Sequence, residues 1–120
     1  MLVPNSITLA VGTTATSTAN RILAAAALVN RWVRGVHATN TTAAIITLNV
    51  GMGVAATLAA GNADIAFGTN IPANASSYPV AVYGGQGKKG LGVGSLNEIM
   101  AFASGAGLLL TVVYSDDTLA

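Results

Sequence analysis

His37 is the single histidine of the 120-residue chain, and it is the side chain best suited to acid–base work near neutral pH. A catalytic triad would need it beside a serine and an aspartate, but Asp64, Asp116 and Asp117 belong to unrelated segments. A transition-metal site would need further ligands, and the chain has no cysteine. We therefore interpret His37 as a partly buried strand residue and expect no enzymatic activity, no cofactor and no metal site.

Residues 85–90 (GQGKKG) have the G-x-G-x-x-G spacing of dinucleotide-binding loops. In such loops a helix must follow the glycines, because its N-terminus holds the pyrophosphate. The residues that follow, LGVGS at 91–95, do not start a helix. We interpret the segment as a hairpin loop whose tip carries Lys88 and Lys89, two charges suited to an acidic partner.

Short β-strands are the elements expected to position these residues. Residues 31–50 (RWVRGVHATNTTAAIITLNV) place two β-branched, aliphatic arms around an Asn-Thr-Thr turn, which predicts a central hairpin. A second hairpin is expected where strands 98–103 and 108–115 meet across 104–107. Further strands are expected at 6–12, 21–24, 64–67 and 80–83.

About eight short strands without a convincing amphipathic helix predict an all-β fold, a single-domain antiparallel β-sandwich or jelly roll. Residues 25–30 are expected to be a connection, with one helical turn as the alternative. The domain spans 1–120 in this prediction, with a short N-terminal arm at 1–5 and a C-terminal tail at 116–120.

Charge is scarce throughout the chain. Charged residues make up 8%, against roughly 25% in an average soluble domain, and the net charge is +1. Such a chain has no field to steer it to nucleic acid or anionic lipid, and its longest apolar run, 22–29, is too short to span a membrane. We expect neither as a partner. Low charge instead favours self-association.

Interaction signals are stronger than catalytic ones. In residues 98–103 (EIMAFA), a core-facing row of Ile99, Ala101 and Ala103 would turn Met100 and Phe102 toward a partner. The alternative is a strand buried on both faces. Trp32 shares its strand face with Arg34, an amphipathic pair common at interfaces. The candidate contacts with another subunit or with a partner are Leu2, Val3, Trp32, Arg34, Lys88, Lys89, Met100 and Phe102.

Three stretches resemble small bacteriophage virion β-sandwich proteins. They are residues 31–50, the IPANASS loop at 71–77, and GSLNEIMAFASGAGLLLTVVYS at 94–115. Residues 51–61 depart from the pattern, being smaller and richer in alanine. The resemblance implies a virion structural protein, commonly a homotrimer. It further implies a capsid decoration (cement) protein on the capsid exterior that binds the major capsid protein and stabilises the shell.

Two alternatives remain within that resemblance. One is a tail, collar or head–tail connector component, which differs chiefly in copy number. The other is a glycan- or receptor-binding tail module, for which Tyr78 and Tyr83 flank a suitable loop although aromatic residues are few.

Overall fold

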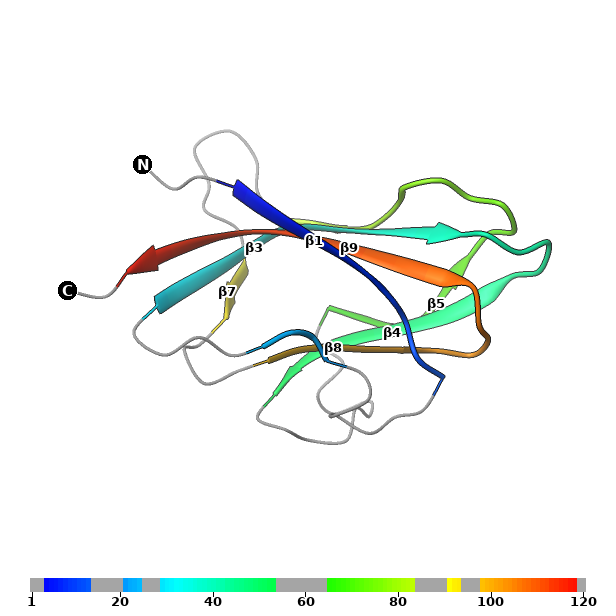
Figure 1. Cartoon of the computed structure of the whole chain (residues 1–120), viewed down its shortest axis with the longest axis horizontal. Helices are drawn as coiled ribbons and strands as arrows, with labels where there is room; N and C mark the ends of the chain where they lie inside the picture. The colour runs from blue at the N-terminus through cyan, green and yellow to red at the C-terminus, as the bar shows by residue number, and fades with distance from the viewer. Residues whose placement is uncertain are drawn as a thin grey trace.

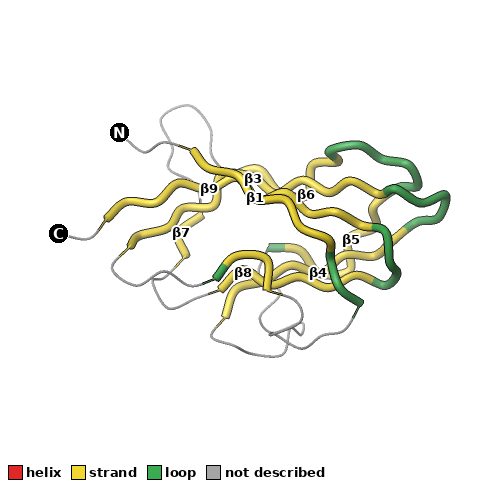
Figure 2. Tube along the Cα trace, viewed as in Figure 1, coloured by secondary structure: helices red, strands yellow, loops and turns green. Residues whose placement is uncertain are grey.

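The computed structural model describes residues 4–13, 21–24, 29–53, 65–83, 91–93 and 98–118. These residues form two antiparallel sheets that pack face to face, and none of them lies in a helix (Figures 1 and 2). The strands are β1 (Pro4–Ala10), β2 (Arg21–Leu23), β3 (Val29–Asn40), β4 (Ile46–Gly53), β5 (Ala66–Ile71), β6 (Tyr78–Val82), β7 (Leu91–Val93), β8 (Glu98–Ala103) and β9 (Leu108–Thr118). The predicted all-β sandwich is confirmed.

Strand pairing follows a nested order. The five-stranded sheet has the order β1-β9-β3-β6, with β7 beside β6 along the same edge of β3, and the four-stranded sheet has the order β2-β8-β4-β5. The first strand therefore pairs with the last, β2 with β8, β3 with β6 and β7, and β4 with β5. The chain is folded like one long hairpin rolled into two layers, which is the jelly-roll topology.

Neither predicted hairpin is present. β3 and β4 lie in different sheets, so residues 41–45 carry the chain across the sandwich, and residues 104–107 do the same between β8 and β9. Residues 72–77 make a third crossing, from β5 to β6. A hairpin and a crossing look alike in sequence because in both cases the two strands direct one apolar face toward the same core.

Strand ends also differ from expectation. β1 begins at Pro4 and β9 continues to Thr118, so both strands extend into the expected arm (1–5) and tail (116–120). Pro4 is tolerated because β1 is an edge strand and Pro4 is its first residue. β7 directly follows the expected loop at 85–90, at residues where no strand was expected.

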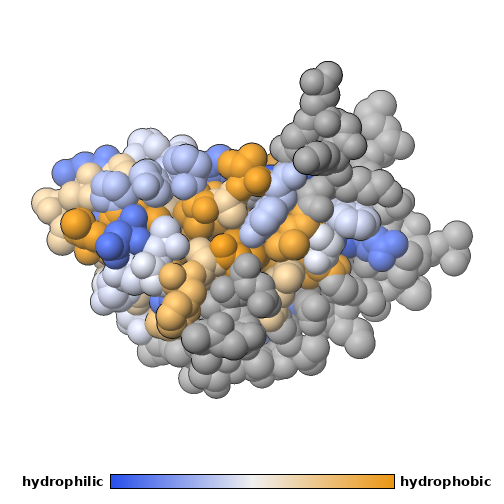
Figure 3. All heavy atoms as spheres, turned by 180° about the vertical axis from the view of Figure 1, so that it is seen from behind, coloured by the Kyte–Doolittle hydropathy of each residue, from blue (hydrophilic) through white to orange (hydrophobic). Residues whose placement is uncertain are grey.

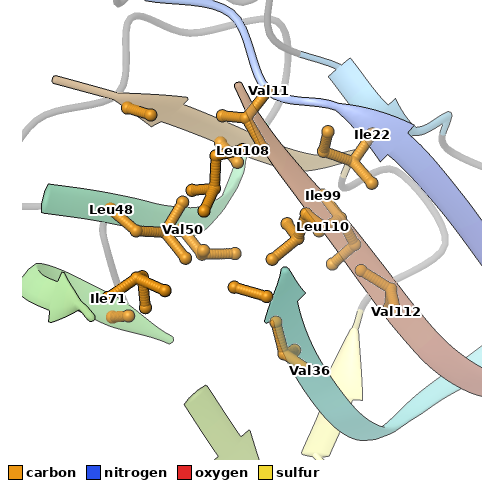
Figure 4. Close-up of a cluster of buried hydrophobic side chains, with 14 of the residues drawn as sticks. Val11, Ile22, Val36, Leu48, Val50, Ile71, Ile99, Leu108, Leu110 and Val112 are labelled. Carbon is orange, nitrogen blue, oxygen red and sulfur yellow. The ribbon is translucent and has the colours of Figure 1, made fainter. Parts of the chain in front are cut away.

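The core fills the space between the sheets. Figure 4 shows aliphatic side chains from both layers directed toward one another, among them Leu48 and Val50 of β4 and Leu110 and Val112 of β9. On β9 these buried residues alternate with more exposed ones, as the period of a strand requires.

A bulge in β3 keeps a twelve-residue strand in contact with this core. The register with β9 shifts between Val33 and Gly35, so Arg34 is the extra residue. Arg31 and Val33 are buried before the bulge, whereas Val36 and Ala38 are buried after it. Odd positions thus face inward in the first part of the strand and even positions in the second.

Gly107, in the crossing 104–107, is expected to be intolerant of any side chain. Its φ is +99°, and a Cβ there would lie 2.5 Å from Thr42 Cγ2. We expect Gly107→Ala to lower the free energy of unfolding by about 2–3 kcal/mol, since backbone strain and a clash act together. The measurement is urea denaturation followed by circular dichroism.

Gly105→Ala is the matched control in the same crossing, because a Cβ at Gly105 meets nothing within 4 Å. Equal midpoints for the two variants would contradict the argument.

Candidate interaction surface

The predicted contact residues do not form one patch. Trp32 and Arg34 belong to β3 in the five-stranded sheet, whereas Met100 and Phe102 belong to β8 in the four-stranded sheet. Both pairs alternate with core residues, so they lie on opposite outer sides of the sandwich. The remaining candidates, Leu2, Val3, Lys88 and Lys89, lie outside the described residues.

Met100 requires a correction. Ile99 and Ala101 do face the core, as the sequence predicts, but the Met100 side chain is 0% exposed and Phe102 is half-buried. Met100 is therefore not accessible to a partner in the isolated chain. The alternative interpretation, a strand buried on both faces, holds at this residue. Alternation shows which face a side chain occupies but not whether other chain segments cover that face.

Two aromatic rings of β3 lie over glycines. A Cβ on Gly92 of β7 would lie 3.2 Å from Trp32 Cζ3, and one on Gly35 would lie 3.3 Å from His37 Nε2. Because glycine has no side chain, each ring can lie close to the backbone on the outer face of the five-stranded sheet. His37 is half-buried in its strand, as the sequence predicts. Its partners across the two adjacent strands are Thr111 and Pro79, neither of which is a carboxylate.

Arg31 is a buried structural residue, and its partner is Asp116, the first residue of the segment that was expected to be a C-terminal tail. Its Nε and Nη2 donate to the two carboxylate oxygens of Asp116 at 2.8 and 3.0 Å, and its Nη1 donates to the carbonyl of Ala24 at 2.7 Å. The guanidinium also lies 4.9 Å from the centre of the Tyr114 ring. These contacts fasten β3, β9 and the residue after β2 together.

Charged residues are distributed unevenly along the fold. The segments 35–63, 65–87 and 99–115 contain no Asp, Glu, Lys or Arg. The three crossings 41–45, 72–77 and 104–107 gather at the end of the molecule opposite the start of β1 and the end of β9 (Figure 1). We call these three crossings the arch end. It has no ionisable side chain.

Asn40 organises the arch end from inside. The side chain is 1% exposed, and its Nδ2 lies 2.7, 3.2 and 3.0 Å from the carbonyl oxygens of Ala44, Ile71 and Pro72. Its Oδ1 accepts from the backbone N–H and the hydroxyl of Thr42 at 2.9 and 2.8 Å. One amide thus holds two of the crossings. The sequence identified Asn40 only as a turn residue.

Further hydrogen bonds join the crossings to one another. The backbone N–H and the hydroxyl of Thr41 both donate to the Gly107 carbonyl, at 3.0 and 2.8 Å. The N–H of Asn74 donates to the Thr42 carbonyl at 2.9 Å. Because every crossing is tied to a neighbour, the arch end presents a pre-organised surface rather than three independent loops.

Ile45 is the most prominent apolar side chain of the arch end, with 65% of its surface exposed. Thr41, Ala43 and Ala44, its neighbours in the same crossing, are exposed as well. Elsewhere, exposed apolar residues are dispersed, and Figure 3 shows hydrophobic and hydrophilic side chains interspersed over the described part of the rear face. Exposure at Ile45 was not predicted, because the run AAII gives no sign that its first isoleucine lies outside the strand.

Within the described ranges, no three His, Cys, Asp or Glu residues come close enough to hold a metal ion. The same residues include no helix long and apolar enough to cross a membrane. Comparisons of the chain with protein-family models, with curated protein sequences and with solved structures give no match.

Proposed function

We propose that the protein is a non-enzymatic bacteriophage virion structural protein. Its role would be that of a capsid decoration protein, a homo-oligomer, trimeric as the resemblance implies, that binds the major capsid protein on the outside of the shell. The observation that carries the proposal is the arch end, an uncharged surface whose crossings are tied together by hydrogen bonds and which includes an exposed aliphatic side chain, Ile45. A pre-organised, uncharged contact surface suits a long-lived complex, because little conformational entropy is lost on binding.

The jelly-roll topology and the scarcity of charge support this proposal. Jelly rolls are common among viral capsid domains, although the fold by itself does not determine function. A decoration protein acts by burying surface at many equivalent sites. Each contact contributes roughly 25 cal/mol per Å² of apolar area, and multivalency sums the contacts over the shell.

Ile45→Asp is the variant expected to weaken capsid binding. Burying an isoleucine contributes about 1.5–3 kcal/mol, so its loss should lower the affinity roughly ten- to hundredfold. The aspartate carboxylate would add a desolvation cost. The measurement is co-sedimentation of the purified protein with shells of the major capsid protein over a concentration series.

Val82→Asp is the matched control, because Val82 is 68% exposed and lies on β6, away from the arch end. Wild-type protein that fails to sediment with the shells would overturn the proposed function. Equal binding by Ile45→Asp and wild type would instead overturn the choice of surface.

Counting copies in whole particles separates decoration, with hundreds of copies, from a connector ring of about six or twelve.

A further inference from the structure

The four edges of the two sheets are not equally protected. Natural sheets block edge-to-edge pairing with short strands, bulges, prolines or charges. β2 and β7 have three residues each, and β2 also has a register shift. β5 has a register shift and a residue, Gly68, at φ +65°. β6 has a register shift and Pro79 inside the strand.

β1 has none of these features in its interior. All seven of its residues pair with β9 without a register shift, its proline is the first residue, and it has no charge. Its side chains are largely exposed, namely Asn5, Ser6, Thr8, Leu9 and Ala10. No described strand pairs with β1 on the side away from β9. Within the described part of the chain, this edge is therefore open to another strand.

The hydrogen-bonding pattern shows which backbone groups this edge presents. The N–H of Val11 donates to the Leu108 carbonyl at 2.9 Å, which makes this a hydrogen-bonded pair of the ladder. Such pairs alternate along antiparallel strands, so Leu9 and Ile7 also direct their N–H and C=O toward β9. Ser6, Thr8 and Ala10 consequently direct theirs toward the open edge.

We propose that β1 pairs antiparallel with β1 of a second copy of this chain, about a two-fold axis at Thr8. In this register Thr8 lies opposite Thr8 of the second copy, and Ser6 lies opposite its Ala10. Every N–H and C=O of these residues then has a partner. Centring the pair on Ile7 instead would place Ala10 opposite Pro4, which has no N–H, and leave the Ala10 carbonyl unpaired.

The side chains also fit the Thr8 register. Ile7 packs against the core, and Leu9 pairs with the buried Leu110 yet is 40% exposed. Pairing places Ile7 opposite Leu9 of the second copy. The two-fold axis makes this contact occur twice, and each contact buries apolar surface. β1 carries no charge, so nothing repels an identical strand. A two-fold contact uses the same strand of both partners, so a second copy of this chain is the partner that fits the β1 edge.

The proposal concerns the fold alone and stands whether or not the protein binds a capsid. Since the contact is two-fold, it produces an even number of chains, either a dimer or a pair of trimers. It continues the five-stranded sheet into the second copy, and the two outer faces become one surface.

Thr8→Lys and Thr8→Glu test the contact. The Thr8 hydroxyl bonds to Thr111 at 2.8 Å on an exposed face, so the substitutions should leave the domain folded, as circular dichroism would verify. Each variant places like charges opposite each other, and we expect the mass from sedimentation equilibrium to be half that of wild type. An equimolar mixture should recover the wild-type mass, because lysine then faces glutamate.

Val82→Lys, at the opposite edge of the same sheet, is the control and should keep the wild-type mass.

Amide hydrogen exchange tests the register of the proposed β1–β1 pair. Protection should fall for Ser6 and Ala10 in Thr8→Lys while Ile7 and Leu9 stay protected. A wild-type mass that is monomeric or trimeric, or a mass unchanged in Thr8→Lys, would overturn the proposal.

Discussion

Asn40→Asp is expected to destabilise the fold by about 3–5 kcal/mol, although the two side chains have nearly the same shape. The Asn40 amide nitrogen donates to one carbonyl oxygen in each of two crossings, those of Ala44 and Pro72, at 2.7 and 3.0 Å, and lies 3.2 Å from the Ile71 carbonyl at the end of β5. An ionised carboxylate donates nothing, so those oxygens would face a buried negative charge. Urea denaturation at neutral pH measures the loss, and the arch end should show the largest gain in amide exchange.

Asn70→Asp is the control for the same chemical change. Asn70 is exposed, and its Oδ1 accepts from the Thr47 hydroxyl at 3.0 Å, a role that a carboxylate oxygen fills equally well. We expect its unfolding midpoint to stay close to that of wild type. If Asn40→Asp unfolds at the same urea concentration as Asn70→Asp, the Asn40 amide is not what holds the crossings.

Asp116→Ala is expected to cost about 2–3 kcal/mol, because it leaves the guanidinium of Arg31 buried without its counter-charge. Arg31 is 8% exposed, whereas the Asp116 side chain is 29% exposed, and that partial exposure keeps the figure below the value for a fully buried pair. Thermal unfolding followed by circular dichroism measures the loss.

The double variant Arg31→Leu with Asp116→Leu distinguishes two causes of the lost stability, the loss of the ion-pair attraction and the burial of an unpaired charge. Replacing both charges by apolar groups removes the desolvation cost, so the double variant should be more stable than Asp116→Ala. A double variant as unstable as the sum of its single losses would show that the two side chains act independently.

The class of fold follows from the sequence, because strand periodicity and the scarcity of helix signals are local properties of the chain. The pairing of strands does not follow. Residues 31–50 were expected to form one hairpin, yet β3 and β4 lie in opposite sheets. That choice depends on which strand occupies the neighbouring position, and for β3 it is β9, about eighty residues further along the chain.

Side-chain exposure was predicted less well than the fold. Met100 was expected at the surface and is buried, while Ile45 was passed over and is exposed. The pairing of Arg31 with Asp116 was not predicted, because residues so distant in sequence give no sign of it. Asn40 was recognised for its turn preference, but its hydrogen bonds depend on where residues 71 and 72 arrive in space.

The absence of ionisable groups from the arch end has a consequence for any complex made there. Salt weakens interactions between charges, and pH changes the charge of titratable groups. The arch end has no charged and no titratable side chain. Its own contribution to binding would come from excluded water and from neutral hydrogen bonds. Such a contact would form without long-range attraction from this surface, and the contribution of this surface would change little over wide ranges of pH and ionic strength.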